Sequence, residues 1–195
     1  MRDQLIASLK PKLDYRSILR KFRASMITSQ TMINRMRPNR RYGFGFPGKK
    51  REFTTKLAFF VDVSGSMTDD ILKRGFGVIN RFFKYGIEST DVYQFDTEIK
   101  DEKPLTMHQA RKEFKLIGRG GTDFQAVLDL LHRKGNPYDG VIIYTDGYAS
   151  RPRVPKGLDT SKILFLFDSE VNYEQCKKNL QGIGKQAFVK SDREQ

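Results

Sequence analysis

The residues of this sequence that could do chemistry are carboxylates and hydroxyls at alternate positions. Asp62, Ser64 and Ser66 are each separated by one residue, and glycine precedes Ser66. On a turn that leaves a strand, these side chains can converge on one hard cation, because glycine lets the backbone bend between them. A glycine-rich loop adds the hydroxyl of Thr122, and a later segment adds the carboxylate of Asp146. Two carboxylates and three hydroxyls balance a divalent charge, so the sequence predicts a site for Mg²⁺ or Mn²⁺.

Four short apolar runs predict the strands that position this site. Each run is almost continuously apolar and too short for a helix, as expected for strands covered on both faces. Segments of helical length lie between and after them, which predicts an α/β fold: a three-layer, open, mostly parallel sheet with helices on both faces. The runs are 57–61, 92–95, 141–144 and 163–167, the aspartates after them are Asp62, Asp96, Asp146 and Asp168, and the helical segments are 68–85, 107–115, 123–134 and 172–181.

One pair of strands is expected to be antiparallel. Few residues separate Phe95 from Ile99, a gap that permits a hairpin but no helical crossover, so the chain reverses between Asp91 and Leu105. In open sheets of this kind, ligands bind outside the carboxyl ends of the strands, where all four aspartates fall.

Asp96 and Asp123 are candidates for carboxylates that contact the metal ligands without binding the metal themselves. The alternative for Asp123 is an N-cap of the helix 124–134, and the alternative for Asp96 and Asp168 is a cap of the turn that follows each strand.

Charge divides the chain into a basic extension, residues 1–51, and a near-neutral body, residues 52–195. The extension holds 14 of the 36 Lys and Arg residues but only two of the 23 acidic residues, and the whole chain has a formal net charge of +13. Such a balance points to a polyanionic partner for the extension, such as nucleic acid. The alternative is a helix packed on the body with its arginines in water.

Within the extension, the sequence predicts a helix followed by a linker or arm. Apolar residues recur at helical spacing after Pro11, and Met32 and Met36 are assigned to helix packing. Proline, glycine and asparagine then predict irregular structure over 37–51. The helical face would consist of Tyr15, Ile18, Leu19, Phe22 and Met26, and the candidate polyanion contacts are Arg37, Arg40, Arg41, Lys49, Lys50 and Arg51.

The pattern Asp-x-Ser-x-Ser at 62–66, with a distant Thr122 and a later Asp146, resembles the metal-ion-dependent adhesion site of von Willebrand factor A domains. The resemblance covers about residues 55–190. It implies that Ser64, Ser66 and Thr122 ligate the metal directly, while Asp62 and Asp146 hold it through water or hydrogen bonds. The metal would then keep a coordination position for a partner's carboxylate.

The stretch Arg-Gly-Gly-Thr-Asp-Phe at 119–124, with the earlier Arg-Arg-Tyr and Phe-Pro-Gly, resembles a narrower bacterial family. In that family a metallopeptidase-like domain precedes a von Willebrand A-like domain, and residues 1–50 resemble the end of the first domain. The resemblance implies a partnership with AAA+ ATPases of the MoxR type, or with a separately encoded metallopeptidase-like domain.

Catalytic centres fit the sequence poorly. A zinc peptidase needs His-Glu-x-x-His, whereas His108 and His132 stand in unrelated contexts. A haloacid dehalogenase-type phosphotransferase needs a general acid where Ser64 stands, and a calcium EF-hand loop needs glycine where Met67 stands and glutamate where Lys73 stands. The Gly-Lys-Ser/Thr ending of a phosphate-binding P-loop is also missing.

These observations favour a non-catalytic, Mg²⁺-dependent interaction module that reads an acidic side chain of a protein partner. The alternatives are nucleic-acid binding through the basic segment and a fragment of a metal-dependent hydrolase. A single cysteine, Cys176, and the lack of a membrane-spanning or signal-like apolar run favour a cytoplasmic protein with no membrane partner.

Overall fold

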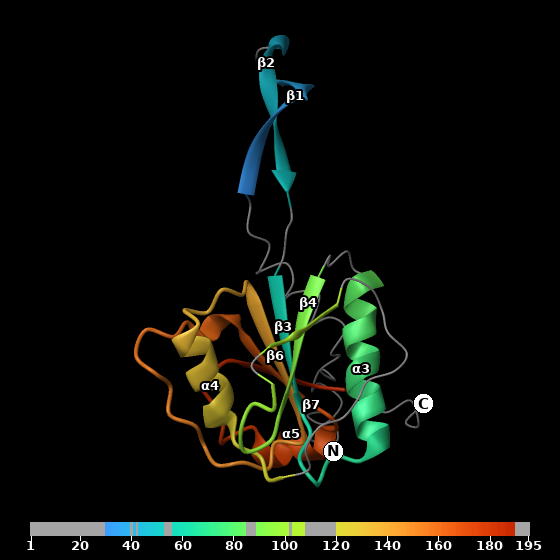
Figure 1. Cartoon of the computed structure of the whole chain (residues 1–195), viewed down its shortest axis with the longest axis vertical. Helices are drawn as coiled ribbons and strands as arrows, with labels where there is room; N and C mark the ends of the chain where they lie inside the picture. Colours follow the sequence, from blue (N-terminus) through green and yellow to red (C-terminus); the bar gives the residue numbers. More distant parts are fainter. Residues whose placement is uncertain are drawn as a thin grey trace, which may run out of the picture.

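The computed structural model describes residues 30–39, 41, 43–52, 56–84, 89–101, 103–107 and 120–189. These residues form a two-stranded sheet and a six-stranded sheet, which Figure 1 shows as separate units. The strands of the large sheet are β3 (Lys56–Asp62), β4 (Ser89–Phe95), β5 (Leu105–Met107), β6 (Gly140–Thr145), β7 (Ile163–Phe167) and β8 (Lys185–Phe188). The helices are α3 (Asp69–Lys84), α4 (Phe124–Arg133), α5 (Glu170–Cys176) and a single 3₁₀ turn, η1 (Thr160–Lys162).

The large sheet has the order β5-β4-β3-β6-β7-β8 and is mostly parallel. Strands β4, β3, β6, β7 and β8 run parallel to one another, and the edge strand β5 pairs antiparallel with β4. The four apolar runs of the sequence all form strands, and the predicted reversal after Phe95 is confirmed, because Phe95 and Ile99 form an antiparallel bridge. The edge strand β8 was not predicted, since Lys185 and Gln186 interrupt its apolar pattern.

Two apolar clusters lie on opposite faces of this sheet, which explains why its central strands have no polar face. Alternate residues of β3 point to opposite sides, so Phe59 faces α3 while Phe60 faces α4. On the α4 side, Phe124 packs edge-to-face on Phe165 with ring centroids 5.5 Å apart. Burial of each such side chain stabilises the fold by about 1.5–3 kcal/mol.

The helices agree with the predicted segments to different degrees. Helix α3 lies within 68–85, and α4 lies within 123–134, with Asp123 as its N-cap accepting a hydrogen bond from the backbone N–H of Gln125 at 2.8 Å. Helix α5 is shorter than 172–181, because turns follow it. In the predicted helix 107–115, Met107 instead ends β5, and the rest lies outside the described residues.

Helix α3 packs closely against β6, and this contact fixes the position of the loop between β3 and α3. A Cβ atom at Gly75 would lie only 2.5 Å from a ring carbon of Tyr144, so the absence of a side chain there makes room for the ring. The Tyr144 hydroxyl donates a hydrogen bond to the backbone oxygen of Ile71 at 3.0 Å. The first turns of α3 are therefore tied to the strand that ends just before Asp146.

The segment expected to be an irregular linker forms a β-hairpin, so that prediction is wrong. Strands β1 (Gln30–Asn39) and β2 (Gly43–Glu52) pair antiparallel, and the assignment of Met32 and Met36 to a helix is also wrong. Proline and glycine are tolerated because both strands of a two-stranded ribbon are edges, and Gly43 takes a positive φ of 65° after the turn. The predicted helix over 15–26 lies outside the described residues.

The hairpin extends away from the large sheet in Figure 1. Its register is interrupted between Asn34 and Pro38 and between Pro38 and Asn39. Across the described part of the chain, no helix is both long and apolar enough to cross a membrane.

Candidate metal centre

The candidate ligands lie at the carboxyl ends of two adjacent parallel strands. Asp62 is the last residue of β3 and Asp146 follows the last residue of β6, and these strands pair directly. Parallel strands end at the same edge, so the two carboxylates are brought to one place. Thr122 reaches the same edge from the loop before α4.

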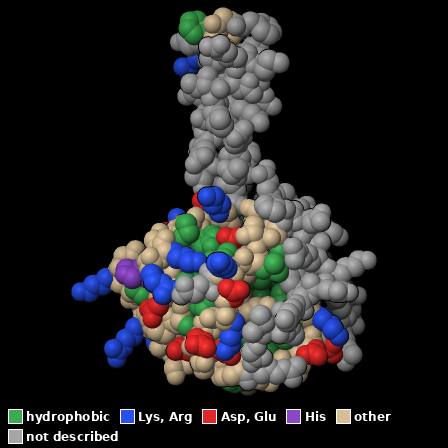
Figure 2. Space-filling view, in the orientation of Figure 1, with side chains coloured by type: hydrophobic (Ala, Val, Ile, Leu, Met, Phe, Trp, Pro, Cys, Tyr) green, Lys and Arg blue, Asp and Glu red, His purple; other side chains and the backbone are tan. Residues whose placement is uncertain are grey.

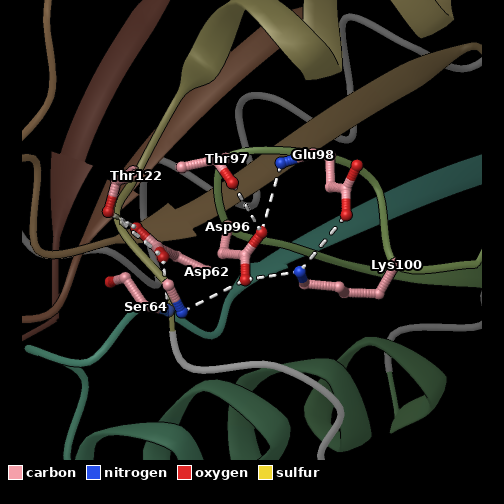
Figure 3. Close-up of polar contacts among 8 residues, drawn as sticks. Asp62, Ser64, Asp96, Thr97, Glu98, Lys100 and Thr122 are labelled. Carbon is pink, nitrogen blue, oxygen red and sulfur yellow. Dashed lines mark hydrogen bonds and ion pairs between the residues drawn. The ribbon is translucent and has the colours of Figure 1, made fainter.

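The Asp62 carboxylate is fully buried and is held by polar groups from three segments. Its Oδ1 accepts a hydrogen bond from the backbone N–H of Ser64 at 3.0 Å, which closes the turn after β3. Its Oδ2 accepts one from the Thr145 hydroxyl at 2.7 Å, and the Thr122 hydroxyl lies 3.3 Å from the same oxygen. Figure 3 shows Asp62, Ser64 and Thr122 grouped in this way.

Burial raises the pKa of Asp62 to about 6, even though hydrogen bonds from Thr145 and Ser64 act in the opposite direction. The nearby charge of Asp146 raises it further. Within the described part of the chain, no Lys or Arg is ion-paired with either carboxylate. The described residues therefore bury negative charge here without supplying the positive charge that would stabilise it.

The two serines of the motif lie side by side, with their hydroxyl oxygens 3.1 Å apart. Ser64 is buried and Ser66 is exposed, so the pair leads from the buried carboxylate to the surface. Asp146 is also buried, and its Oδ1 accepts a hydrogen bond from the backbone N–H of Tyr148 at 3.2 Å. All five candidate residues are thus brought to one end of β3 and β6.

This set of donors suits a hard cation. Two carboxylates and three hydroxyls are oxygen ligands of the kind that Mg²⁺ prefers, with water completing the coordination. In the ranges that the structure describes, no group of three or more His, Cys, Asp or Glu residues is arranged so that it could hold a metal ion by itself. A softer metal that requires imidazole or thiolate ligands therefore has no comparable set of residues there.

Asp96 lies at the end of the neighbouring strand β4 in a different environment. Its Oδ2 forms an ion pair with Lys100 at 2.7 Å and accepts a hydrogen bond from the backbone N–H of Gly120 at 3.2 Å. Burial acts to raise the pKa of Asp96, but the Lys100 ammonium and the N–H groups of Glu98 and Gly120 outweigh it and hold the pKa below its usual value. Asp96 both caps its own turn and touches the loop that carries Thr122.

Asp168 follows β7, but Ser169 is the N-cap of α5, and in the described part of the chain the Asp168 carboxylate accepts hydrogen bonds from side chains alone, so the prediction that it caps this turn is wrong. Its Oδ1 accepts hydrogen bonds from the Asn172 amide at 2.7 Å and from the Ser169 hydroxyl at 3.3 Å. Burial raises its pKa, and the charge of Asp146 adds to this effect.

Sequence reasoning missed Thr145 and Lys100, which directly hold two of the aspartates. The available signals were weak: a threonine just before Asp146, and a lysine four residues after Asp96. Neither distinguishes a hydrogen-bond partner from an ordinary surface residue.

The remaining candidates lie on other elements or outside the described residues. Of the polyanion contacts, Arg37 lies on β1, Lys49, Lys50 and Arg51 lie on β2, Arg41 is exposed in the turn, and Arg40 lies outside the described residues. His132 is exposed in the last turn of α4, His108 is not described, and Cys176 is buried at the end of α5. On the face of the body seen in Figure 2, basic and acidic side chains are interspersed.

Comparison with known proteins found a relative that is similar in sequence. An uncharacterised protein of Thermotoga maritima is 27% identical over 179 residues, which cover 92% of this chain and 43% of that protein. The chain thus spans less than half the length of this relative.

Two solved structures are also similar. The ArnB paralog VWA2 from Sulfolobus acidocaldarius has 15% identity and a TM-score of 0.41, covering 58% of this chain and 34% of that one. The D319A mutant of the PilB minor pilin from Streptococcus sanguinis has 14% identity and a TM-score of 0.45, covering 75% and 61%.

The family comparison is more direct. The sequence model of the family described as "VWA-like domain (DUF2201)" matches residues 57–174, which is more than half of the chain. The matched segment runs from β3 into α5 and includes all five candidate metal ligands. The chain therefore belongs to the VWA-like domain family DUF2201.

Proposed function

We propose that this protein is a Mg²⁺-dependent interaction module that binds an acidic side chain of a partner protein. The observation that carries the proposal is the fully buried Asp62 carboxylate beside Asp146, with hydroxyls around it and no ion-paired cation among the described residues. A buried carboxylate of this kind destabilises the protein unless a positive charge approaches it.

In the proposed site, Ser64, Ser66 and Thr122 contribute hydroxyl ligands, and Asp62 and Asp146 contribute the balancing negative charge. The exposure of Ser66 leaves the site open toward solvent on one side. A bound Mg²⁺ would supply a positive centre that accepts a carboxylate from outside the chain. The residues of this chain orient the ligand oxygens and exclude water from the Asp62 carboxylate.

The surroundings of the site support a protein partner. Tyr148 and Val171 are exposed by 56% and 65%, and Tyr148 is tied to Asp146 through its backbone N–H. The Tyr148 hydroxyl donates a hydrogen bond to the Gln175 side-chain oxygen at 2.7 Å and lies 3.1 Å from the Asn172 side-chain oxygen, which holds the ring against α5. An exposed aromatic ring on a fixed base is typical of interaction surfaces.

The class of partner rests on sequence resemblance alone. An AAA+ ATPase or a separately encoded metallopeptidase-like chain is the proposed source of the carboxylate. Reading frames next to the gene test this choice, because either partner would be recognisable there by its own motifs.

Calorimetric titration of the full chain with Mg²⁺ and with Mn²⁺ tests the metal site. We expect one-to-one binding that the Ser64→Ala/Ser66→Ala double variant loses while its circular dichroism is unchanged. Ser161→Ala, which alters an exposed serine beside Asp159, is the matched control. Equal metal affinity in the double variant and the wild type would contradict the assignment.

The carboxylate step needs its own measurement. Water-proton relaxation of the Mn²⁺-loaded protein reports on solvent bound to the metal, so N-acetyl-aspartate amide should lower it by displacing water. The uncharged N-acetyl-asparagine amide is the control. Relaxation that responds equally to both compounds would show that no carboxylate is recognised.

A second candidate function is nucleic-acid binding by the hairpin of β1 and β2. One observation favours it: basic residues lie along a two-stranded ribbon that is separate from the main sheet, and a ribbon of this kind fits the major groove of DNA. Binding of this type is dominated by phosphate contacts and weakens steeply with salt.

Gel-shift titrations at two salt concentrations, with and without EDTA, test the second candidate. Lys49→Ala/Lys50→Ala/Arg51→Ala should weaken DNA or RNA binding, whereas Lys73→Ala/Lys156→Ala/Lys178→Ala, which removes three exposed charges of the body, should not. EDTA should have no effect on it. Equal losses in both triple variants would rule out the hairpin as the binding surface.

A further inference from the structure

The loop that presents Thr122 is attached to a single residue at both of its ends. The backbone N–H of Gly120 donates a hydrogen bond to Asp96 Oδ2 at 3.2 Å, and the backbone N–H of Asp123 donates one to the Asp96 backbone oxygen at 2.8 Å. Thr122 lies between these two attachment points. The position of its hydroxyl therefore depends on the position of Asp96.

The Asp96 carboxylate is itself fixed from two sides. Its Oδ1 accepts hydrogen bonds from the Glu98 backbone N–H at 3.2 Å and from the Thr97 hydroxyl at 3.3 Å. Its Oδ2 is shared between Gly120 and the ammonium of Lys100, which is only 19% exposed. Figure 3 shows Lys100 on the side of Asp96 that faces away from Thr122. Lys100 thus keeps the carboxylate ionised and in one orientation.

Gly120 also connects Asp96 to the turn that carries Ser64 and Ser66. A Cβ atom at Gly120 would lie 2.9 Å from Asp96 Oδ2, so the close approach requires glycine. The Gly120 backbone oxygen accepts a hydrogen bond from the backbone N–H of Gly65 at 2.9 Å, in the turn between Ser64 and Ser66. The chain of contacts therefore runs from Lys100 to the loops that carry all three hydroxyl ligands.

We infer that Asp96 and Lys100 are positioning residues that hold the Thr122 hydroxyl at Asp62, 3.3 Å away, before a cation arrives. This inference rests on the proposed metal site and deepens it. A loop with two consecutive glycines, Gly120 and Gly121, loses much conformational freedom when it is ordered. We call the pair of Asp96 and Lys100 the clamp. Because the clamp orders the loop in advance, binding of the cation does not have to order it, and the affinity for the cation is higher.

Calorimetric titration of the full chain with Mn²⁺ measures the contribution of the clamp. Lys100→Met removes the ammonium and keeps most of the side chain, and we expect it to weaken Mn²⁺ binding about 10-fold, as loss of supporting contacts around a metal site does. Asp96→Asn should act in the same direction. The control is Lys73→Met, which removes an exposed ion pair with Asp70 on α3 and should leave the affinity unchanged.

A double-mutant cycle with Thr122→Ala separates positioning from a general structural role. If the clamp acts mainly through Thr122, Lys100→Met should weaken Mn²⁺ binding much less once Thr122 is alanine. A loss that is the same in both backgrounds would overturn the inference. An unchanged affinity in Lys100→Met with Thr122 present would overturn it as well.

Amide hydrogen exchange in EDTA tests the clamp without metal. Lys100→Met should speed exchange at Gly120 and Asp123, whose N–H groups are bonded to Asp96, and leave exchange in β6 unchanged. If the wild type binds no metal, the proposed function fails and so does the role of the clamp in metal binding, but faster exchange would still show that the clamp holds the loop. Unchanged exchange would overturn the clamp, whatever the metal does.

Discussion

Asp62 and Asp96 stand at the ends of neighbouring parallel strands, and both are buried, yet their carboxylates are stabilised in opposite ways. Asp96 has an ammonium partner in Lys100 and accepts N–H groups from two loops, so its pKa is lowered. In the part of the chain that the structure describes, Asp62 accepts hydrogen bonds from hydroxyls and one N–H but has no ammonium partner, and burial, with Asp146 nearby, raises its pKa to about 6.

The comparison teaches that burial does not decide the charge of a carboxylate by itself. Burial acts to raise the pKa of both groups, and the sign of the net shift depends on what the chain places next to them. At Asp96 the chain supplies its own cation. At Asp62 no Lys or Arg among the described residues forms an ion pair, which is the basis for proposing that the cation comes from solution.

The largest expected difference is in metal binding. Asp62→Asn should weaken Mn²⁺ binding by about 100-fold or more, because it removes half of the negative charge of the site, whereas Asp96→Asn should cost only about 10-fold through the loop. Calorimetry measures both, with Asp159→Asn as the control for an exposed, capping aspartate. Similar losses in the two variants would erase the distinction between the two carboxylates.

The stability of the metal-free protein should show the reverse order. Asp96→Asn breaks an ion pair and is expected to lower the free energy of unfolding by about 2 kcal/mol. Asp62→Asn removes an unfavourable buried charge and is expected to raise it by about 1 kcal/mol at pH 7.5. Urea unfolding in EDTA checks the signs, and a large loss of stability in Asp62→Asn would contradict this account.

The pH dependence of stability should differ between the two groups. Because the pKa of folded Asp62 is about 6 and its ordinary value is 3.8, folding favours its protonated form, and its contribution falls as the pH rises from about 4 to about 6. Asp96 has the opposite shift, so its contribution is present above its ordinary pKa and is lost only in more acidic solution.

Urea unfolding in EDTA across this range, compared between wild type and Asp62→Asn, isolates the Asp62 contribution. The difference between the two curves should grow by about 1–2 kcal/mol between pH 4 and pH 6 and then stay level. Asp168, whose pKa is also raised, is present in both proteins and cancels. A difference that does not change with pH would show that Asp62 is not perturbed.

The smallest effect is expected at the second acidic partner of Lys100. Glu98 lies 3.7 Å from the ammonium and is 76% exposed, so Glu98→Gln should change stability by less than about 0.5 kcal/mol and leave Mn²⁺ affinity unchanged. The same unfolding and calorimetric measurements apply. An effect as large as that of Asp96→Asn would mean that Lys100 acts through Glu98 instead.

Much of the fold could be predicted because its signals are local. The four apolar runs became strands, since a strand covered on both faces has no polar side, and the short gap after Phe95 allowed only a reversal. For Asp123, the alternative of an N-cap, which its position before an apolar helix offered, is confirmed. The hairpin was not predicted, because its proline and glycine residues indicate breaks in any context except an isolated ribbon.

The alternation of strands with helices and the candidate ligands Asp62, Ser64, Ser66, Thr122 and Asp146 follow from the order of residues alone, because apolar periodicity and motif spacing are properties of the sequence. Only the tertiary structure decides which aspartate receives a positive partner. Lys100, Gly120 and Thr145 reach the two carboxylates from separate segments, and the pKa of each carboxylate is set by the sum of such contacts. Electrostatic energy depends on distance in space, and distance in space appears only once the strands have been brought side by side.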